Sequence, residues 1–155
     1  MGDLRDLILP KAVLPRLGAV NKRQALQTLA EALATAGGAD PRAAFDAVLM
    51  RERLAGTGIG EGVAVPHARL PGLVRPIAGF ARLDPPIDFD ALDGRPADLV
   101  CMILAPDDRG GDHLKALAKV SRALRHADMR ERLRAARGHD ELMAALAAAV
   151  PVAAA

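Results

Sequence analysis

The stretch Asp98-Leu-Val-Cys-Met-Ile-Leu-Ala105 decides the fold class of this chain. It is a nearly continuous apolar run of β-branched and aliphatic residues, which is typical of a strand in a sheet that is covered on both faces. Pro106 follows directly and ends the run, because proline cannot continue the hydrogen-bond ladder of a central strand. We therefore expect a central strand with helices on both sides of its sheet.

The segments around this run alternate between strand and helix patterns. The apolar run 77–83 predicts a second strand. The turn-rich residues 84–96 join the two strands without a crossover helix, which favours a mixed sheet. Residues 1–20 indicate a short helical pattern followed by an edge strand. The fold class predicted is a three-layer α/β domain, a mixed β-sheet flanked by helices on both faces.

Helix ends are indicated by capping patterns. Asn21 is followed three residues later by Gln24, as in a capping box, and Asp128 and Glu131 repeat that spacing. Asp40-Pro41 matches an N-cap followed by proline at the first helical position. Helices are predicted at 21–37, 40–53, from 112, from 128 and at 140–149. The helix from 112 is expected to bury the face Leu114, Leu117, Ala118, Ser121 and Leu124.

Length and composition favour one globular domain. The chain has 155 residues, of which 51% are hydrophobic and 26% charged, and we expect a domain at 1–150 and a tail at 151–155. No apolar run approaches the roughly 20 residues that a membrane span needs, and the first residues lack a signal-peptide pattern. We therefore expect no membrane insertion and a cytoplasmic location.

Charge and cysteine content argue against two further classes. The net charge is only +2, and the chain has no Trp, no Tyr and three Phe to stack on bases, so we expect no nucleic-acid partner. The single cysteine, Cys101, lies inside the apolar run. An internal disulfide is therefore impossible, and a buried structural thiol is expected.

A second stretch, Arg51-Glu-Arg-Leu-Ala-Gly-Thr-Gly-Ile-Gly-Glu-Gly-Val-Ala-Val-Pro-His67-Ala-Arg69, holds the candidate site. Pro66 biases the residue before it towards an extended conformation, so we expect a short strand whose end presents His67 in a defined direction. Arg51 falls in the last turn of a predicted helix, next to a loop whose glycines can adopt conformations that other residues resist.

The chemistry that these residues permit is phosphoryl transfer. At an ordinary pKa of about 6.5 a histidine is mostly neutral at pH 7, and a neutral imidazole is a nucleophile that can take a phosphoryl group. Such a site needs charge neutralisation from guanidinium groups, backbone N–H groups or a helix N-terminus. The candidates are Arg51, Arg69, Thr57, the loop glycines Gly58 and Gly60, and His113 in the first turn of a predicted helix.

Residue spacing alone leaves structural roles open for the histidines, and it argues against a metal site and a serine hydrolase. A histidine after Val-Ala-Val-Pro is also compatible with a structural or surface role, and so is His113. The chain has no HExxH motif, no cysteine pair and no tight His/Asp cluster, so we expect no metal site. Ser121 is the only serine and lies in a predicted helix without a nucleophile-elbow motif, which argues against a serine hydrolase.

The stretch Thr57-Gly-Ile-Gly-Glu-Gly-Val-Ala-Val-Pro-His67-Ala-Arg69 resembles the phosphorylation-site signature of the type-2 IIA proteins of the bacterial phosphoenolpyruvate-dependent phosphotransferase system. The resemblance extends to Arg51-Glu52, to Ile87-Asp-Phe-Asp-Ala-Leu-Asp-Gly94, to residues 98–106 and to Gly111-Asp-His-Leu-Lys-Ala-Leu-Ala118. The pattern is most similar to the nitrogen-related members, in which Pro-His is followed by Ala-Arg and no transport domain is fused.

This resemblance implies that His67 accepts a phosphoryl group on Nε2 from an HPr-like carrier protein. Arg51 matches the active-site arginine of the family and His113 its second active-site histidine. Thr57, Arg69, Gly58 and Gly60 match the signature and are assigned supporting, phosphate-binding roles. No cofactor is implied beyond the phosphoryl group itself, which derives from phosphoenolpyruvate. The departures from the family pattern are Val65, where isoleucine is commoner, and Gly110-Gly111 before the second histidine.

The function implied is a nitrogen-related IIA phosphocarrier, a component of a phosphotransferase system rather than a stand-alone enzyme. Its phosphorylation state is expected to regulate partner proteins, which in this family include ion transporters and sensor kinases. One alternative is a sugar-specific IIA component, of the fructose or mannitol type, that passes phosphate to a IIB domain. Another is a binding module whose site is never phosphorylated in the cell.

Overall fold

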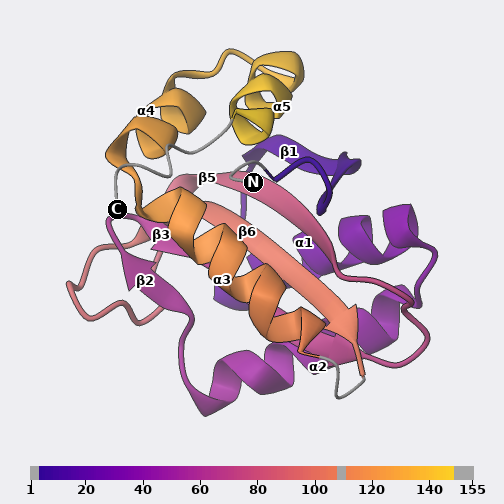
Figure 1. Ribbon diagram of the computed structural model, residues 1–155. Helices are drawn as coiled ribbons and strands as arrows, with labels where there is room; N and C mark the ends of the chain where they lie inside the picture. The colour runs from indigo at the N-terminus through magenta and orange to yellow at the C-terminus, as the bar shows by residue number, and fades with distance from the viewer. Residues whose placement is uncertain (1–3, 108–110, 149–155) are drawn as a thin grey trace.

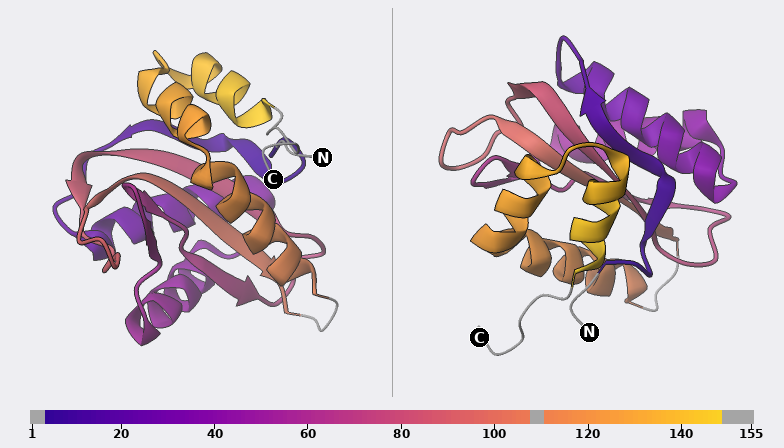
Figure 2. Two further views of the ribbon diagram at one scale, coloured as in Figure 1. Left: turned by 60° about the vertical axis from the view of Figure 1, so that its left-hand side comes forward. Right: turned by 90° about the horizontal axis from the view of Figure 1, so that it is seen from above.

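A mixed β-sheet forms the middle layer of the molecule, and helices cover both of its faces (Figure 1, Figure 2). The structure is a computed structural model that describes residues 4–107 and 111–148. The predicted tail at 151–155 lies outside the described residues, so that boundary stays a prediction. The elements are β1 (Ile8–Leu17), α1 (Lys22–Gly37), α2 (Pro41–Leu54), β2 (Gly58–Gly60), β3 (Val63–Ala64), β4 (His67–Leu70), β5 (Ile77–Ile87), β6 (Ala97–Pro106), α3 (Asp112–Arg125), α4 (Ala127–Ala135) and α5 (His139–Ala147).

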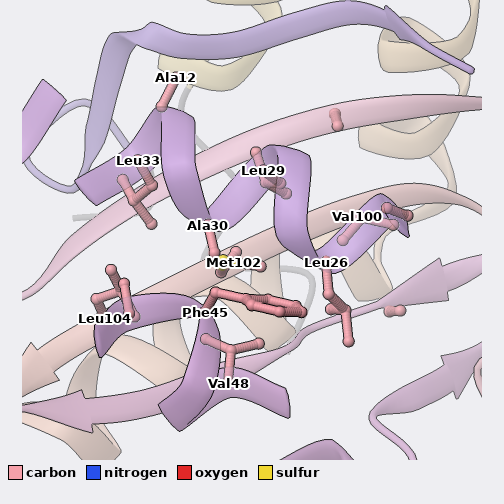
Figure 3. Close-up of a cluster of buried hydrophobic side chains, with 14 of the residues drawn as sticks. Ala12, Leu26, Leu29, Ala30, Leu33, Phe45, Val48, Val100, Met102 and Leu104 are labelled. Carbon is pink, nitrogen blue, oxygen red and sulfur yellow. The ribbon is translucent and has the colours of Figure 1, made fainter. Parts of the chain in front are cut away.

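The apolar run at 98–105 lies in β6, at the centre of the sheet, as predicted. β6 pairs antiparallel with β5 and parallel with both β3 and β4. Its side chains alternate between two cores, because successive residues of a strand point to opposite faces. Val100, Met102 and Leu104 pack under α1 and α2 (Figure 3). Leu99, Cys101 and Ile103 pack against α3, α4 and α5. The predicted three-layer α/β fold with a mixed sheet is confirmed.

β1 and β5 differ from the sequence prediction at their ends. Residues 5–7 form a turn rather than a helix, and β1 begins at Ile8 and lies parallel to β5 at the edge of the sheet. β1 contains Pro10 and Pro15, which an edge strand tolerates. β5 continues to Ile87, so the prediction of a connector from residue 84 was wrong. Its pairing with β6 skips from Arg82 to Ile87, and the prolines in between donate no ladder hydrogen bond.

The ends of α1 and α2 follow the predicted capping patterns. The Asn21 side chain accepts a hydrogen bond from the Gln24 backbone N–H at 2.8 Å. The Gln24 side chain accepts from the N–H of Val20 rather than from that of Asn21, so the reciprocal half of the box is shifted by one residue. Gly38 ends α1 with a φ of 74°, and Asp40 caps α2.

The predicted buried face of α3 and the predicted cap of α4 were wrong. Besides Leu124, the residues of α3 that are buried are Ala116, Val120 and Ala123. The helix therefore turns the face with Ala116, Val120 and Ala123 towards the sheet, and Leu114 is 63% exposed. α4 begins directly after α3, with His126 at the N-cap and no side-chain cap, because one residue separates the two helices. Asp128 lies in the first turn of α4 instead.

A two-residue turn joins β2 to β3 in an antiparallel hairpin. Its residues, Glu61 and Gly62, have φ values of 59° and 78°, the positive pair that a type I′ turn requires. The Arg134 guanidinium crosses this turn and donates two hydrogen bonds of 2.9 Å to the Asp98 carboxylate. A Cβ atom at residue 62 would lie 2.5 Å from the Arg134 side chain, so glycine is required there.

Candidate functional site

His67 is the first residue of β4 and is held by the central strand. β3 and β4 lie along the same edge of β6, with Ala64 opposite Val100 and His67 opposite Ile103. Pro66 separates the two short strands, and its carbonyl accepts a hydrogen bond of 3.0 Å from Ile103 N–H. The histidine therefore begins a strand instead of following the end of one, and its backbone direction is fixed.

The imidazole of His67 has one ring nitrogen engaged. Nδ1 lies 2.9 Å from the carbonyl oxygen of Val65. A carbonyl oxygen can only accept a hydrogen bond, so Nδ1 carries the proton and Nε2 keeps its lone pair. Burial lowers the pKa of His67 below its ordinary value of 6.5, and the charge of Arg51 lowers it further. The ring is thus a neutral nucleophile at pH 7 with Nε2 as the reactive atom.

His113 comes from α3 and faces His67. The centroids of the two rings are 5.2 Å apart, and the ring planes meet at 49°. His113 is the second residue of α3, where backbone N–H groups lack intrahelical partners and the helix dipole is positive. Burial, followed by His67, Arg69 and Arg51, lowers the pKa of His113. Its Nδ1 is buried without a hydrogen-bond partner among the described residues. The predicted pairing of the two histidines is present in the structure.

Two arginines add positive charge to the site. Arg51 lies in the last turn of α2, and its Nη1 donates a hydrogen bond of 2.7 Å to the carbonyl of Ala55. Its charge lowers the pKa of both histidines. Arg69 is two residues beyond His67 on β4 and points to the same face of the sheet. Arg51 therefore acts electrostatically on both histidines and Arg69 on His113, and their contact with a phosphate stays a prediction.

The loop glycines Gly58 and Gly60 are the first and last residues of β2. Gly58 N–H donates to the carbonyl of Phe89, at 3.0 Å. Gly60 lines a pocket with Ser121 and Arg125. These two residues lie 8 and 12 positions beyond His113 on α3, roughly 12 to 18 Å along the helix axis. Both glycines pair with β3 in the hairpin, and their supporting role at a phosphate stays a prediction.

Thr57 is connected to Glu52, a residue to which the sequence analysis gave no role. Glu52 is 4% exposed, and its carboxylate accepts hydrogen bonds from the hydroxyl and the backbone N–H of Thr57, at 2.6 and 2.8 Å. Lys22 forms an ion pair with Glu52 at 3.2 Å. The signal was present, because Glu52 continues the inward stripe of Phe45 and Val48 at helical spacing. A carboxylate in that stripe indicates a buried ion pair.

The described residues contain no arrangement for a metal and no membrane helix. Within 4–107 and 111–148, no three His, Cys, Asp or Glu side chains are grouped to hold a metal ion. In the same ranges, every helix is too short or too polar to span a bilayer.

The mixed sheet between two helical layers is the fold of solved IIA structures that this chain resembles. The chain belongs to the family described as "Phosphoenolpyruvate-dependent sugar phosphotransferase system, EIIA 2", whose model matches residues 7–149. The predicted family is thus confirmed.

Individual relatives refine this assignment. The chain is 48% identical, over 144 residues, to the nitrogen regulatory protein of Bradyrhizobium diazoefficiens, covering 93% of this chain and 94% of the relative. It is 46% identical, over 113 residues, to the fructose-specific EIIA component of Haloferax volcanii, covering 72% and 73%. The crystal structure of nitrogen regulatory protein IIA-Ntr from Neisseria meningitidis matches with a TM-score of 0.83 at 28% identity, covering 91% and 97%.

Proposed function

We propose that this protein is a nitrogen-related IIA phosphocarrier that accepts a phosphoryl group on His67 Nε2 from an HPr-like carrier protein. The observation that carries this proposal is the contact between His67 Nδ1 and the Val65 carbonyl. It leaves Nε2 as the nucleophile, in the neighbourhood of Arg51 and His113.

The transfer step balances between two imidazoles. The lone pair of His67 Nε2 attacks the phosphorus of the carrier's phosphohistidine, a new N–P bond forms, and the N–P electron pair of the carrier returns to its own ring. Charge spreads over the phosphoryl oxygens during the transfer. Arg51, Arg69 and the N-terminus of α3 supply positive potential for these oxygens, while the hydrogen bond to Val65 stabilises the charge that develops on the His67 ring.

A regulatory role is supported by the similarity to nitrogen regulatory proteins and by the surface next to the site. The relative that is 48% identical carries that name and matches over nearly its whole length. Leu114 and Leu54 are 63% and 79% exposed, and they adjoin the two helix ends that carry His113 and Arg51. Exposed apolar residues of this kind suit protein docking. A phosphoryl group adds about −1.5 to −2 charges to this face, which is enough to change partner binding.

The partners that we propose are the HPr-like donor and regulated proteins, with ion transporters and sensor kinases as family expectations. We place this activity in the cytoplasm. A second candidate function, a sugar-specific IIA component that passes phosphate to a IIB domain, is supported by the similarity to a fructose-specific EIIA component.

The test is phosphorylation of the purified protein with phosphoenolpyruvate, the first enzyme of the system and the HPr-like carrier. We expect an acid-labile adduct of about 80 Da in the wild type and none in His67→Ala. The matched control is His139→Ala, a change at an exposed histidine on α5, which should keep the adduct. Absence of the adduct from the wild type, or its persistence in His67→Ala, would refute the proposal.

A further assay separates the two candidate functions. Loss of the phosphoryl group on addition of a IIB domain and its sugar would favour the sugar-specific function. Partners that co-purify differently with wild type and His67→Ala would favour regulation, and partners that bind both forms equally would favour a binding module that needs no phosphorylation.

A further inference from the structure

A continuous series of hydrogen bonds joins a buried carboxylate to the reactive histidine. Glu52 accepts from the hydroxyl and the N–H of Thr57. The Thr57 carbonyl accepts from Val65 N–H at 3.0 Å. The Val65 carbonyl in turn accepts from Nδ1 of His67, at 2.9 Å. The last of these bonds decides which ring nitrogen is free.

The carboxylate at the start of this series is itself fixed from several elements. Lys22, the first residue of α1, lies 3.2 Å from Glu52 and 3.0 Å from Asp90 in the segment between β5 and β6. A buried carboxylate must be paired and hydrogen-bonded to offset its loss of hydration. Glu52 is both ion-paired and hydrogen-bonded. Thr57 therefore binds a carboxylate whose position is fixed by the surrounding structure.

We propose that Glu52 is a positioning residue for phosphoryl acceptance: it fixes Thr57, Thr57 orients Val65, and the Val65 carbonyl holds His67 with Nε2 facing the site. This inference rests on the proposed function, since it gives Glu52 a part in the same transfer. Glu52 itself does not touch the phosphoryl group, because its carboxylate is spent on Thr57 and Lys22.

The negative charge of Glu52 and its positioning role are expected to have opposite effects on the rate of phosphoryl acceptance. An experiment can therefore separate them. The groups that act on His67 are Arg51 and Glu52 from α2, with His113 facing the ring from α3; Glu52 raises the pKa of His67 and Arg51 lowers it. Glu52→Gln therefore lowers the pKa of His67 and removes a charge that repels incoming phosphate. At pH 7 the ring is already neutral, so the lower pKa only weakens the nucleophile slightly, whereas the lost repulsion favours acceptance. Lost positioning is therefore identified by the tautomer of His67, which neither electrostatic change alters.

The first experiment measures the tautomer of His67 by nitrogen NMR in the unphosphorylated protein. We expect Nδ1–H with a free Nε2 in the wild type. In Glu52→Gln and Thr57→Val we expect a mixture of tautomers, because the Val65 carbonyl is no longer held. Thr57→Ser keeps the hydroxyl and should keep the wild-type tautomer. Asp46→Asn, an exposed acid on the same helix, is the matched control.

The second experiment measures the rate of acceptance from the phosphorylated carrier at pH 7. A misplacement of about 1 Å can cost roughly 100-fold in rate, so we expect Glu52→Gln to be about 10- to 100-fold slower and Thr57→Val several-fold slower. Asp46→Asn should stay within about twofold of wild type, and Thr57→Ser, which keeps the hydroxyl, should be faster than Thr57→Val. Thermal unfolding of each variant checks that it is folded, and if Glu52→Gln is not, the Thr57→Val and Thr57→Ser pair decides.

The proposal is overturned if Glu52→Gln and Thr57→Val keep a single Nδ1–H tautomer and wild-type rates. Failure of the proposed function gives a different result, because a wild type that takes no phosphate still yields a tautomer measurement. A mixed tautomer in the variants would then show that Glu52 orients the ring, although the ring would not be a phosphate acceptor.

Discussion

Replacing Arg51 with alanine is expected to slow phosphoryl acceptance by about 30- to 150-fold. At an effective dielectric constant near 20, a guanidinium 4 Å from a phosphoryl charge contributes about 4 kcal/mol. Arg51 is partly exposed to solvent, which reduces this to about 2 to 3 kcal/mol. The variant also loses the hydrogen bond from Arg51 to Ala55, worth about 1 kcal/mol. In a domain of this size that lowers Tm by about 2 to 4 °C, so the protein stays folded.

The same substitution should shift the pH dependence of the reaction. The charge of Arg51 lowers the pKa of both His67 and His113, so its removal raises both values. More of the acceptor is then protonated at a given pH, and the midpoint of the pH–rate curve moves up.

The assay is single-turnover transfer from the phosphorylated HPr-like carrier, measured between pH 5 and 8. Arg51→Lys should be intermediate, because lysine keeps the charge but loses the planar fork. Arg69→Ala is the comparison variant, and its effect should be smaller because Arg69 is exposed. Equal rates in Arg51→Ala and Arg69→Ala would refute the reasoning.

Three further outcomes are expected. Since the pKa values of His67 and His113 are lowered in the folded state, the unfolded chain takes up protons first as the pH falls below about 6.5. The free energy of unfolding should therefore decrease as the pH falls, and urea unfolding at a series of acid pH values checks this. The transfer rate should decrease once the pH falls below the pKa of His67 in the folded protein. Gly62→Ala should cost about 2 to 4 kcal/mol in urea unfolding, against about 1 to 2 for Gly94→Ala, which has a similar φ but open space around it. Burial raises the pKa of the Cys101 thiol to about 12, so iodoacetamide at pH 8 should label it only after unfolding, and labelling of the native protein would contradict its place in the core.

Much of the fold could be predicted because it depends on local signals. The seven residues at 99–105 are apolar on both sides of the strand, which favours a central position in the sheet. Asn21, Gly38 and Asp40 act through backbone geometry within a few residues. The buried face of α3 could not be predicted in this way, because the local sequence does not indicate whether Leu114 or Ala116 is buried. The packing of α3 on the sheet buries Ala116 and leaves Leu114 exposed.

The sequence indicated residues that the structure brings together at the candidate site, but it did not indicate their contacts. His67, Arg51 and His113 were found from residue type and resemblance, and the structure brings the two rings to 5.2 Å. The role of Glu52 was missed, because its ion-pair partner Lys22 is 30 positions away and the two meet only when α1 packs on α2. The hydrogen bond from Gly58 N–H to the carbonyl of Phe89 was not predictable for a similar reason, since Phe89 lies 31 positions later.

The attachment of His67 to the central strand has a consequence for how its state is communicated. Its backbone is paired with Ile103, and its ring is held by Val65, so a phosphoryl group added at Nε2 meets a scaffold with little freedom to rearrange. We therefore expect the modified and unmodified proteins to share one backbone. A partner protein that distinguishes the two forms must therefore contact the modified face directly. It recognises the phosphoryl group with its own binding surface, and no remote conformational change in the IIA protein is needed.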